Sequence, residues 1–236
     1  MARAGTSPGG RVGTEAPSRS LSPRALAIAG WAAFLLAGVL FIAVAWNVAA
    51  HAPVLGLDAA VMAWLNTRRT VALTTVMLAI THTHSLAAIA AWSVVFAAVL
   101  ARMREWYWIL TLALAVGGGM ALNVLLKLTY ERARPAMDDP IVTLQTFSFP
   151  SGHTAASTVF YGVLAAFLVT RLRRRRWRST VVAGAVAAVA LVAASRVYLG
   201  AHFPSDVIAA ASWSTAWLVL CLSSVHGLVR RRRARP

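Results

Sequence analysis

The sequence predicts an all-α polytopic membrane protein with six transmembrane helices. Three observations predict it. Apolar residues make up 59% of the 236 and charged residues only 13%. Long stretches carry no charge at all, and the arginines gather in clumps between those stretches. Soluble domains have about half apolar and about a quarter charged residues, so this composition indicates a chain folded in lipid.

Six apolar segments have the length of about 20 residues that a helix needs to cross a bilayer. We place these spans at 25–48, 80–101, 107–128, 153–170, 179–197 and 207–228. Between the first two, the segment 58–70 is typical of a short helix lying at the membrane surface.

Two tails flank the membrane domain, which we assign to 24–229. Residues 1–23 are rich in Gly, Ser, Pro and Arg, which predicts a disordered cytoplasmic tail. A signal peptide is the alternative, but the apolar run that follows is too long for a signal core and long enough to span. Residues 230–236 form a basic cytoplasmic tail.

The net charge of +16 would suggest nucleic acid on a soluble surface, but here the basic residues adjoin apolar spans. We therefore expect no nucleic-acid partner. With six spans, the arginines near 3–24, 102–104, 171–178 and 230–235 all fall on one face. The positive-inside rule makes that face cytoplasmic. This predicts a plasma-membrane protein with both termini in the cytoplasm and basic clusters near anionic lipids. Arg68 and Arg69 fall on the other face and do not fit the rule. The sequence does not indicate an oligomeric state.

The residues that could bind phosphate or take part in catalysis lie in three sequence blocks. These blocks are predicted to meet at the non-cytoplasmic end of the bundle. They are 127–135 (KLTYERARP), 150–153 (PSGH) and 195–206 (SRVYLGAHFPSD). Three cationic side chains with few acidic residues near them in the sequence can bind a phosphate dianion. The guanidinium of arginine can donate hydrogen bonds to two phosphate oxygens at once. Ser151 and Gly152 open a span, where free backbone N–H groups and the helix dipole favour an anion. The predicted phosphate-binding residues are Lys127, Arg134, Ser151, Gly152 and Arg196.

Two histidines and a carboxylate complete the predicted site. Asp206, in the first turn of the last span, can accept a hydrogen bond from His202 and leave the other ring nitrogen free. That nitrogen can attack phosphorus and form a covalent intermediate. His153 then protonates the departing oxygen and later activates water. These roles require a neutral His202 and a protonated His153, which predicts a bell-shaped pH dependence.

Together, the blocks resemble the signature of the type 2 phosphatidic acid phosphatase superfamily, K-x6-RP, PSGH and SR-x5-H-x3-D, with no departure at a fixed position. The resemblance implies a helical core like that of the related haloperoxidases and hydrolysis of a lipid phosphate or diphosphate without a metal or cofactor. It also implies inhibition by vanadate and assigns the eight residues the same roles. Candidate substrates are polyprenyl diphosphate, slightly favoured for a chain of bacterial character, phosphatidate and phosphatidylglycerol phosphate.

Several alternatives stay open at this point. A lipid phosphotransferase would use the same site with a hydroxyl in place of water, and a transporter or lipid-binding protein would keep the cations without catalysis. A soluble vanadium haloperoxidase shares the signature but does not fit six spans. We expect His82 and His84 to lie at the opening of the site rather than to form a metal centre. Two histidines without acidic or thiol partners would bind a metal ion only weakly.

Overall fold

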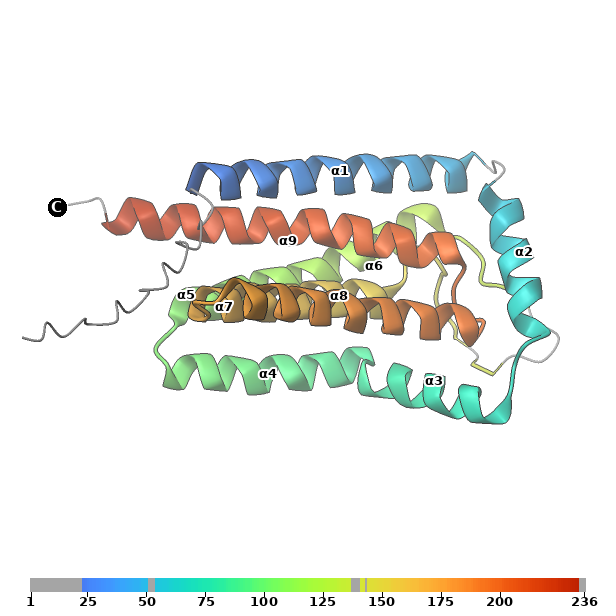
Figure 1. Cartoon of the computed structure of the whole chain (residues 1–236). Helices are drawn as coiled ribbons and strands as arrows, with labels where there is room; N and C mark the ends of the chain where they lie inside the picture. The colour runs from blue at the N-terminus through green and yellow to red at the C-terminus, as the bar shows by residue number, and fades with distance from the viewer. Residues whose placement is uncertain (1–22, 51–53, 137–140, 143, 234–236) are drawn as a thin grey trace, which may run out of the picture.

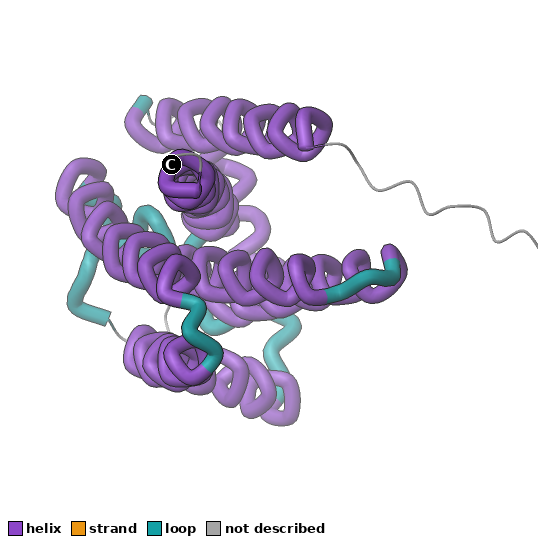
Figure 2. Tube along the Cα trace, turned by 90° about the vertical axis from the view of Figure 1, so that its left-hand side faces the viewer, coloured by secondary structure: helices purple, strands orange, loops and turns teal. Residues whose placement is uncertain are grey.

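A computed structural model describes residues 23–50, 54–136, 141–142 and 144–233, and over these residues the chain is a bundle of helices (Figure 1). A view along the bundle contains helices and loops but no strand in this part of the chain (Figure 2). The all-α prediction is therefore confirmed. The predicted tail at 1–23 lies outside the described residues apart from its last residue.

The helices follow one another with short connections, and the longest break lies between α6 and α7. In chain order they are α1 (Pro23–Ala49), α2 (Val54–Asn66), α3 (Val71–Thr83), α4 (Leu86–Arg102), α5 (Trp106–Leu112), the π-helix η1 (Ala113–Gly118), α6 (Gly119–Tyr130), α7 (Gly152–Arg171), α8 (Arg175–Tyr198) and α9 (Pro204–Arg233). Five helical segments among these are long and apolar enough to cross a membrane, with α5, η1 and α6 counted as one. The pair α3 and α4, bent by 49°, makes a sixth.

The prediction for the second span was wrong in its start. The sequence placed the span at 80–101, whereas the helical pair runs from α3 through α4 and begins nearer residue 71. Thr70, assigned to the surface helix, instead caps α3 by accepting a hydrogen bond from the backbone N–H of Leu73 at 3.3 Å. Ser85 caps α4 in the same way through the N–H of Ala88 at 3.1 Å. The polar residues around Ser85 thus mark a break between two helices rather than a beginning.

A π-helical turn interrupts the third span. A π-helix leaves backbone groups without their usual α-helical partners, and in a membrane such groups need another donor or acceptor. The indole Nε1 of Trp217 on α9 donates to the carbonyl of Leu114 within η1 at 3.2 Å. Close to this contact, Gly118 leaves room for the same indole ring, because a Cβ there would lie 2.8 Å from Trp217 Cζ2. The irregular turn is therefore supported by a side chain from the neighbouring helix.

Helix α7 lies at the centre of the bundle and packs against α4, α6, α8 and α9. Its small residues let neighbouring helices approach closely, as is usual where helices associate in lipid. At Gly162 the approach is tightest, since a Cβ there would lie 2.1 Å from Leu218 Cδ2 of α9. A core cluster containing Ile89, Val159 and Phe160 surrounds this contact. The centre of the bundle is thus fixed by small residues on α7.

Gly162→Val is expected to lower the free energy of unfolding by about 1–3 kcal/mol, because the added methyl groups overpack the contact with Leu218. Gly184→Val on α8 is the matched control, since a Cβ at this exposed position has nothing within 4 Å. Thermal unfolding of the two purified variants in the same detergent measures the difference. Equal midpoints would contradict the tight packing of α7 against α9.

The two ends of the bundle differ in charge. At one end, on the right in Figure 1, lie α2, the C-termini of α6 and α8 and the N-termini of α7 and α9. The opposite end carries the connections α4–α5 and α7–α8, with the arginines of 102–104 and 171–178. Arg68 and Arg69 lie at the first end, where Arg68 covers the Trp64 ring at 4.6 Å and Arg69 donates to the carbonyl of Tyr198 at 3.4 Å. Both arginines therefore make contacts within the protein at this end.

Candidate active site

The three sequence blocks meet at the end of the bundle that lies away from the arginine-rich connections. At this end the last turns of α6 and α8 lie near the first turns of α7 and α9. The structure brings together all the residues predicted for the site. They come from these four helix ends and from the segments that join them: Lys127, Arg134, Ser151, Gly152, His153, Arg196, His202 and Asp206.

His202 is buried in this cluster, with 2% of its surface exposed. Its Nε2 lies 3.4 Å from Nη1 of Arg134, which can only donate a hydrogen bond, so Nε2 carries the lone pair and Nδ1 the proton. Nδ1 faces Oδ2 of Asp206 at 3.5 Å, which is longer than an ordinary hydrogen bond. Burial lowers the pKa of His202 to about 4, against the opposing effect of Asp206. The ring is therefore neutral at physiological pH.

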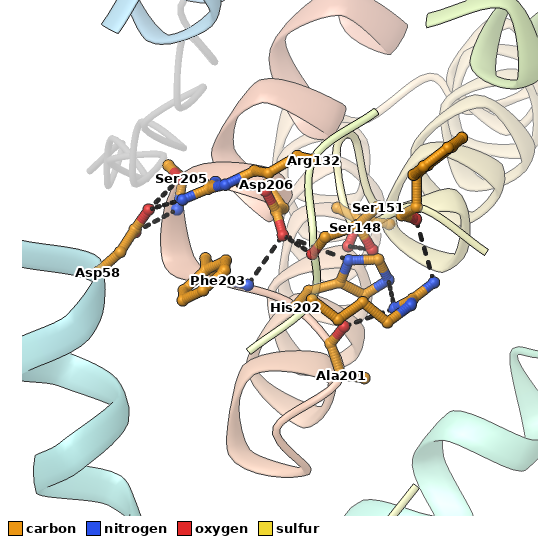
Figure 3. Close-up of polar contacts among 12 residues, drawn as sticks. Asp58, Arg132, Ser148, Ser151, Ala201, His202, Phe203, Ser205 and Asp206 are labelled. Atoms are coloured by element: carbon orange, nitrogen blue, oxygen red, sulfur yellow. Dashed lines mark hydrogen bonds and ion pairs between the residues drawn. The ribbon is translucent and has the colours of Figure 1, made fainter. Parts of the chain in front are cut away.

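Asp206 is completely buried, and its carboxylate is held by three donors (Figure 3). Its Oδ2, the oxygen that faces His202, accepts from the hydroxyl of Ser148 and from the backbone N–H of Phe203 at 2.9 Å. Its Oδ1 accepts from Nη1 of Arg132 at 2.6 Å. These contacts stabilise the ionised carboxylate and fix its orientation toward the histidine ring.

Of the three predicted phosphate-binding cations, Arg196 has buried donors that make no hydrogen bond to the described part of the chain. Its side chain is 2% exposed, and Nη1 donates to the hydroxyl of Thr81 at the end of α3. Nε and Nη2 are buried and have no hydrogen-bond partner among the residues that the structure describes. A buried guanidinium with two unused donors is costly, because the desolvation is not compensated. The same two donors form the fork that binds two oxygens of a phosphate.

The other two cations close the loop that precedes α7. Arg134 donates through Nε to the carbonyl of Thr146 at 2.6 Å and through Nη1 to the carbonyl of Ala201 at 2.5 Å. Burial lowers the pKa of Arg134, which Asp206 partly offsets, and the guanidinium remains a cation. Lys127 donates to the carbonyl of Phe147 in the same loop. Both cations thus tie the loop 144–150 to the site.

The N-terminus of α7 differs in one respect from the expectation. The backbone N–H of Ser151 was expected to be free for an anion, but it donates to the carbonyl of Asp206 at 3.2 Å. The N–H groups of Gly152 and His153, in the first turn, have no intrahelical acceptor and can take that role. A Cβ at Gly152 would lie 3.4 Å from Nδ2 of Asn123, which is an ordinary van der Waals contact. His153 is half-buried and within electrostatic reach of Arg196 and His202.

Four buried or half-buried residues around the site were not assigned from the sequence. Arg132 belongs to the first block, yet the signature gives it no role. Asp58 offered a signal, because a carboxylate in an apolar segment is costly without a partner. Ser148 and Ser205 offered no signal that distinguishes them from other serines. The contacts of these residues surround the carboxylate of Asp206 (Figure 3).

The aromatic residues near the blocks serve different purposes. Phe149 is buried and packs against Tyr130 with ring centroids 4.8 Å apart, so this pair is part of the core. The hydroxyl of Tyr198 accepts from the N–H of Thr70 at 3.2 Å and joins α8 to α3. Phe203 lies against Arg132, whose guanidinium carbon is 4.2 Å from the ring centroid. Tyr130 and Phe203 both line a cavity beside the site.

A cavity of about 780 Å³ opens beside the site, between the C-terminus of α1, α2 and the segment after α6. Arg132, Arg134 and Phe203 line its inner wall, and residues of α1 and α2 line the outer wall. Ligand sites usually have volumes of about 300–1,000 Å³, so the cavity is large enough for a lipid headgroup.

His82 and His84 have different surroundings. His82 is exposed, whereas His84 is half-buried at the bend between α3 and α4. Nδ1 of His84 lies 2.8 Å from the carbonyl of Ile80, and Nε2 lies 2.7 Å from the hydroxyl of Tyr161. Among the residues that the structure describes, no three His, Cys, Asp or Glu side chains are grouped so as to hold a metal ion.

Comparisons with known proteins agree with the geometry. The family model described as the PAP2 superfamily matches residues 106–230, more than half of the chain. Phosphatidylglycerophosphatase B of Bacillus subtilis is 41% identical over 102 residues, which are 42% of this chain and 49% of that protein. The match thus spans about half the length of this curated relative.

Two solved structures resemble most of the bundle. The transmembrane PAP2-type phosphatidylglycerolphosphate phosphatase from Bacillus subtilis has a TM-score of 0.72 and 32% identity, covering 84% of this chain and 96% of its own. Aquifex aeolicus LpxE, with a TM-score of 0.57 and 22% identity over 71% of this chain and 95% of its own, shares the fold. The resemblance drawn from the three blocks is confirmed, as is the predicted transmembrane fold. This chain belongs to the PAP2 superfamily.

Proposed function

We propose that this protein is a lipid phosphate phosphatase that works without a metal through a phosphohistidine intermediate. One observation carries the proposal: the buried guanidinium of Arg196 keeps two donors unused beside a neutral histidine. Lys127 and Arg134 lie within electrostatic reach of the same point. Three cations neutralise the transferring phosphoryl group, the role that magnesium ions have in kinases.

The first step transfers the phosphoryl group to His202. The lone pair on Nε2 attacks phosphorus, the bond from phosphorus to the lipid oxygen breaks, and that oxygen takes the electron pair and a proton from His153. Asp206 stabilises the positive charge that develops on the ring of His202. The lipid alcohol then leaves.

The second step regenerates the enzyme. His153, now neutral, removes a proton from a water molecule as its oxygen attacks phosphorus. The P–N bond breaks, its electrons return to Nε2, and inorganic phosphate is released. If a lipid or sugar hydroxyl replaced water here, the same residues would catalyse phosphotransfer.

Phosphatidylglycerol phosphate is the substrate that we place first, because the sequence match and the solved structure from Bacillus subtilis, at 41% and 32% identity, both carry its name. This changes the order that the sequence favoured, in which polyprenyl diphosphate came first. We further propose that the site faces the non-cytoplasmic side of the plasma membrane. The arginine-rich connections at the opposite end of the bundle support this orientation.

The test is phosphate release by the purified protein in detergent with a chelator present, from a panel of lipid monophosphates and diphosphates. We expect release that persists in the chelator and is inhibited by vanadate. Release that requires an added divalent metal would contradict the mechanism. Folded protein that releases no phosphate but labels an added lipid alcohol would identify a phosphotransferase.

The pH dependence of the rate is expected to be bell-shaped. His202 reacts only when neutral, and burial lowers its pKa to about 4, so the acid limb of the profile should fall as the pH drops through 4. The alkaline limb belongs to the enzyme–substrate complex, in which the bound phosphate dianion favours the protonated form of His153, and the rate falls as His153 loses that proton. Measurement of kcat against pH, which reports the complex, tests both limbs. A profile that is flat from pH 5 to 9, or an acid limb above pH 6, would contradict these assignments.

A further inference from the structure

Arg132 joins the surface helix α2 to the catalytic carboxylate. Its Nη2 donates to Oδ2 of Asp58 on α2 at 2.8 Å, and its Nη1 donates to Oδ1 of Asp206 at 2.6 Å (Figure 3). Nη1 also donates to the hydroxyl of Ser205 at 2.7 Å. One guanidinium thus bridges two carboxylates that lie 148 positions apart in the sequence (58 to 206).

The two carboxylates and the guanidinium that bridges them are all largely buried. Asp58 and Asp206 are 2% and 0% exposed, and the side chain of Arg132 is 10% exposed beneath the ring of Phe203. An ionised carboxylate in such a place needs a cationic partner, because water does not reach it. Removing one member of a buried pair leaves the other uncompensated.

Arg132 also donates the hydrogen bond to Oδ1 of Asp206, the carboxylate oxygen that does not face His202. Ser148 and the N–H of Phe203 both bind Oδ2, the oxygen that faces His202. Oδ1 accepts from Arg132, and no other hydrogen bond to it is found within the described part of the chain. With Arg132 gone, Oδ1 would be a buried acceptor without a donor, which favours rotation or protonation of the carboxylate.

Asp58 holds Arg132 from the other side. Its Oδ1 accepts from the backbone N–H of Ser205 at 2.9 Å, and its Oδ2 accepts from the hydroxyl of the same residue. Ser205 lies in the first turn of α9, directly before Asp206. Asp58 therefore fixes both the guanidinium and the helix end that carries the catalytic carboxylate.

We propose that Arg132, held by Asp58, is a positioning residue that keeps the carboxylate of Asp206 directed at Nδ1 of His202. The inference rests on the proposed function, since it concerns the nucleophile of that reaction. It extends the catalytic pair of His202 and Asp206 by two residues and places the last of them on the surface helix α2.

Arg132→Gln is expected to lower kcat by about 100-fold, the size of effect that follows from misplacing a reacting group, while KM stays within about threefold. Arg132→Lys keeps the charge but loses the fork and should recover part of the rate. Glu105→Gln is the matched control, because it removes the ion pair with Arg171 at the opposite end of the bundle. A kcat of Arg132→Gln equal to that of the control would overturn the proposal.

A double-mutant cycle tests the part of Asp58. Asp58→Asn is expected to lower kcat about tenfold alone and to have little further effect in the Arg132→Gln background, because both act through one carboxylate. Two reductions in kcat that simply multiply would overturn the chain of contacts. If Arg132→Gln does not fold, the single variants Asp58→Asn and Arg132→Lys decide on kcat in the same way.

The tautomer of His202 gives a reading that does not depend on activity. In protein labelled with ¹⁵N-histidine, the signal of His202 is identified by its absence from His202→Ala. We expect the proton on Nδ1 in the wild type and a mixture of tautomers in Arg132→Gln. An unchanged tautomer overturns the inference even if the wild type hydrolyses lipid phosphates. A changed tautomer supports it even if no tested lipid is a substrate, which would count against the proposed function alone.

Discussion

His202→Ala is expected to abolish phosphate release, with a loss in kcat of at least about 10⁴-fold, the range seen when a nucleophile is removed. The cations remain in this variant, so lipid phosphate should still bind. Nε2 of His202 is the ring nitrogen whose lone pair faces Arg134, at 3.4 Å from Nη1.

Rapid quenching with ³²P-labelled substrate makes the prediction specific. Wild-type protein should carry label that is stable in base and lost in acid, as expected for a phosphoramidate, and His202→Ala should carry none. His82→Ala is the control, because His82 is an exposed histidine near the C-terminus of α3. Equal phosphate release by His202→Ala and wild type would point to contamination or to another nucleophile.

The eight residues proposed for the site could be selected from the sequence because each belongs to a pattern of nearby residues. Three such patterns can be recognised in the sequence before the structure is known. They are cations at the ends of apolar spans, a Ser-Gly pair at the start of a helix, and a histidine four residues before a carboxylate. Helix position then follows from hydropathy, since spans of about 20 residues fix which ends share a face. The structure brings these ends together at one end of the bundle.

Tertiary contacts were not predictable in the same way. Asp58 lies far from Asp206 in sequence, and only the docking of α2 on the start of α9 shows that one arginine serves both. The bend between α3 and α4 was missed because the polar residues near Ser85 also suit the start of a span. Hydropathy detects apolar length, but it does not detect where one span breaks into two helices.

The role proposed for Arg196 sets catalysis against stability at this site. Its guanidinium is buried with two donors unused, so the folded protein without phosphate bears an uncompensated cost. Natural proteins keep such costly groups where function requires them. Stability and activity should therefore respond to a change at this position with opposite signs.

Arg196→Met is expected to lower kcat by about 10²–10³-fold, because it removes donors aimed at the charge that develops on the phosphoryl group. The thermal unfolding midpoint is expected to stay equal or rise, since an apolar side chain of similar length replaces a buried charge without full pairing. Thr81→Val is the control: it removes the hydroxyl that anchors Nη1 but keeps the cation, and its loss in kcat should be about tenfold or less. Vanadate inhibition should weaken in Arg196→Met and persist in Thr81→Val. A lower midpoint with unchanged kcat would make Arg196 a structural residue, and the two unused donors would then need another explanation than phosphate.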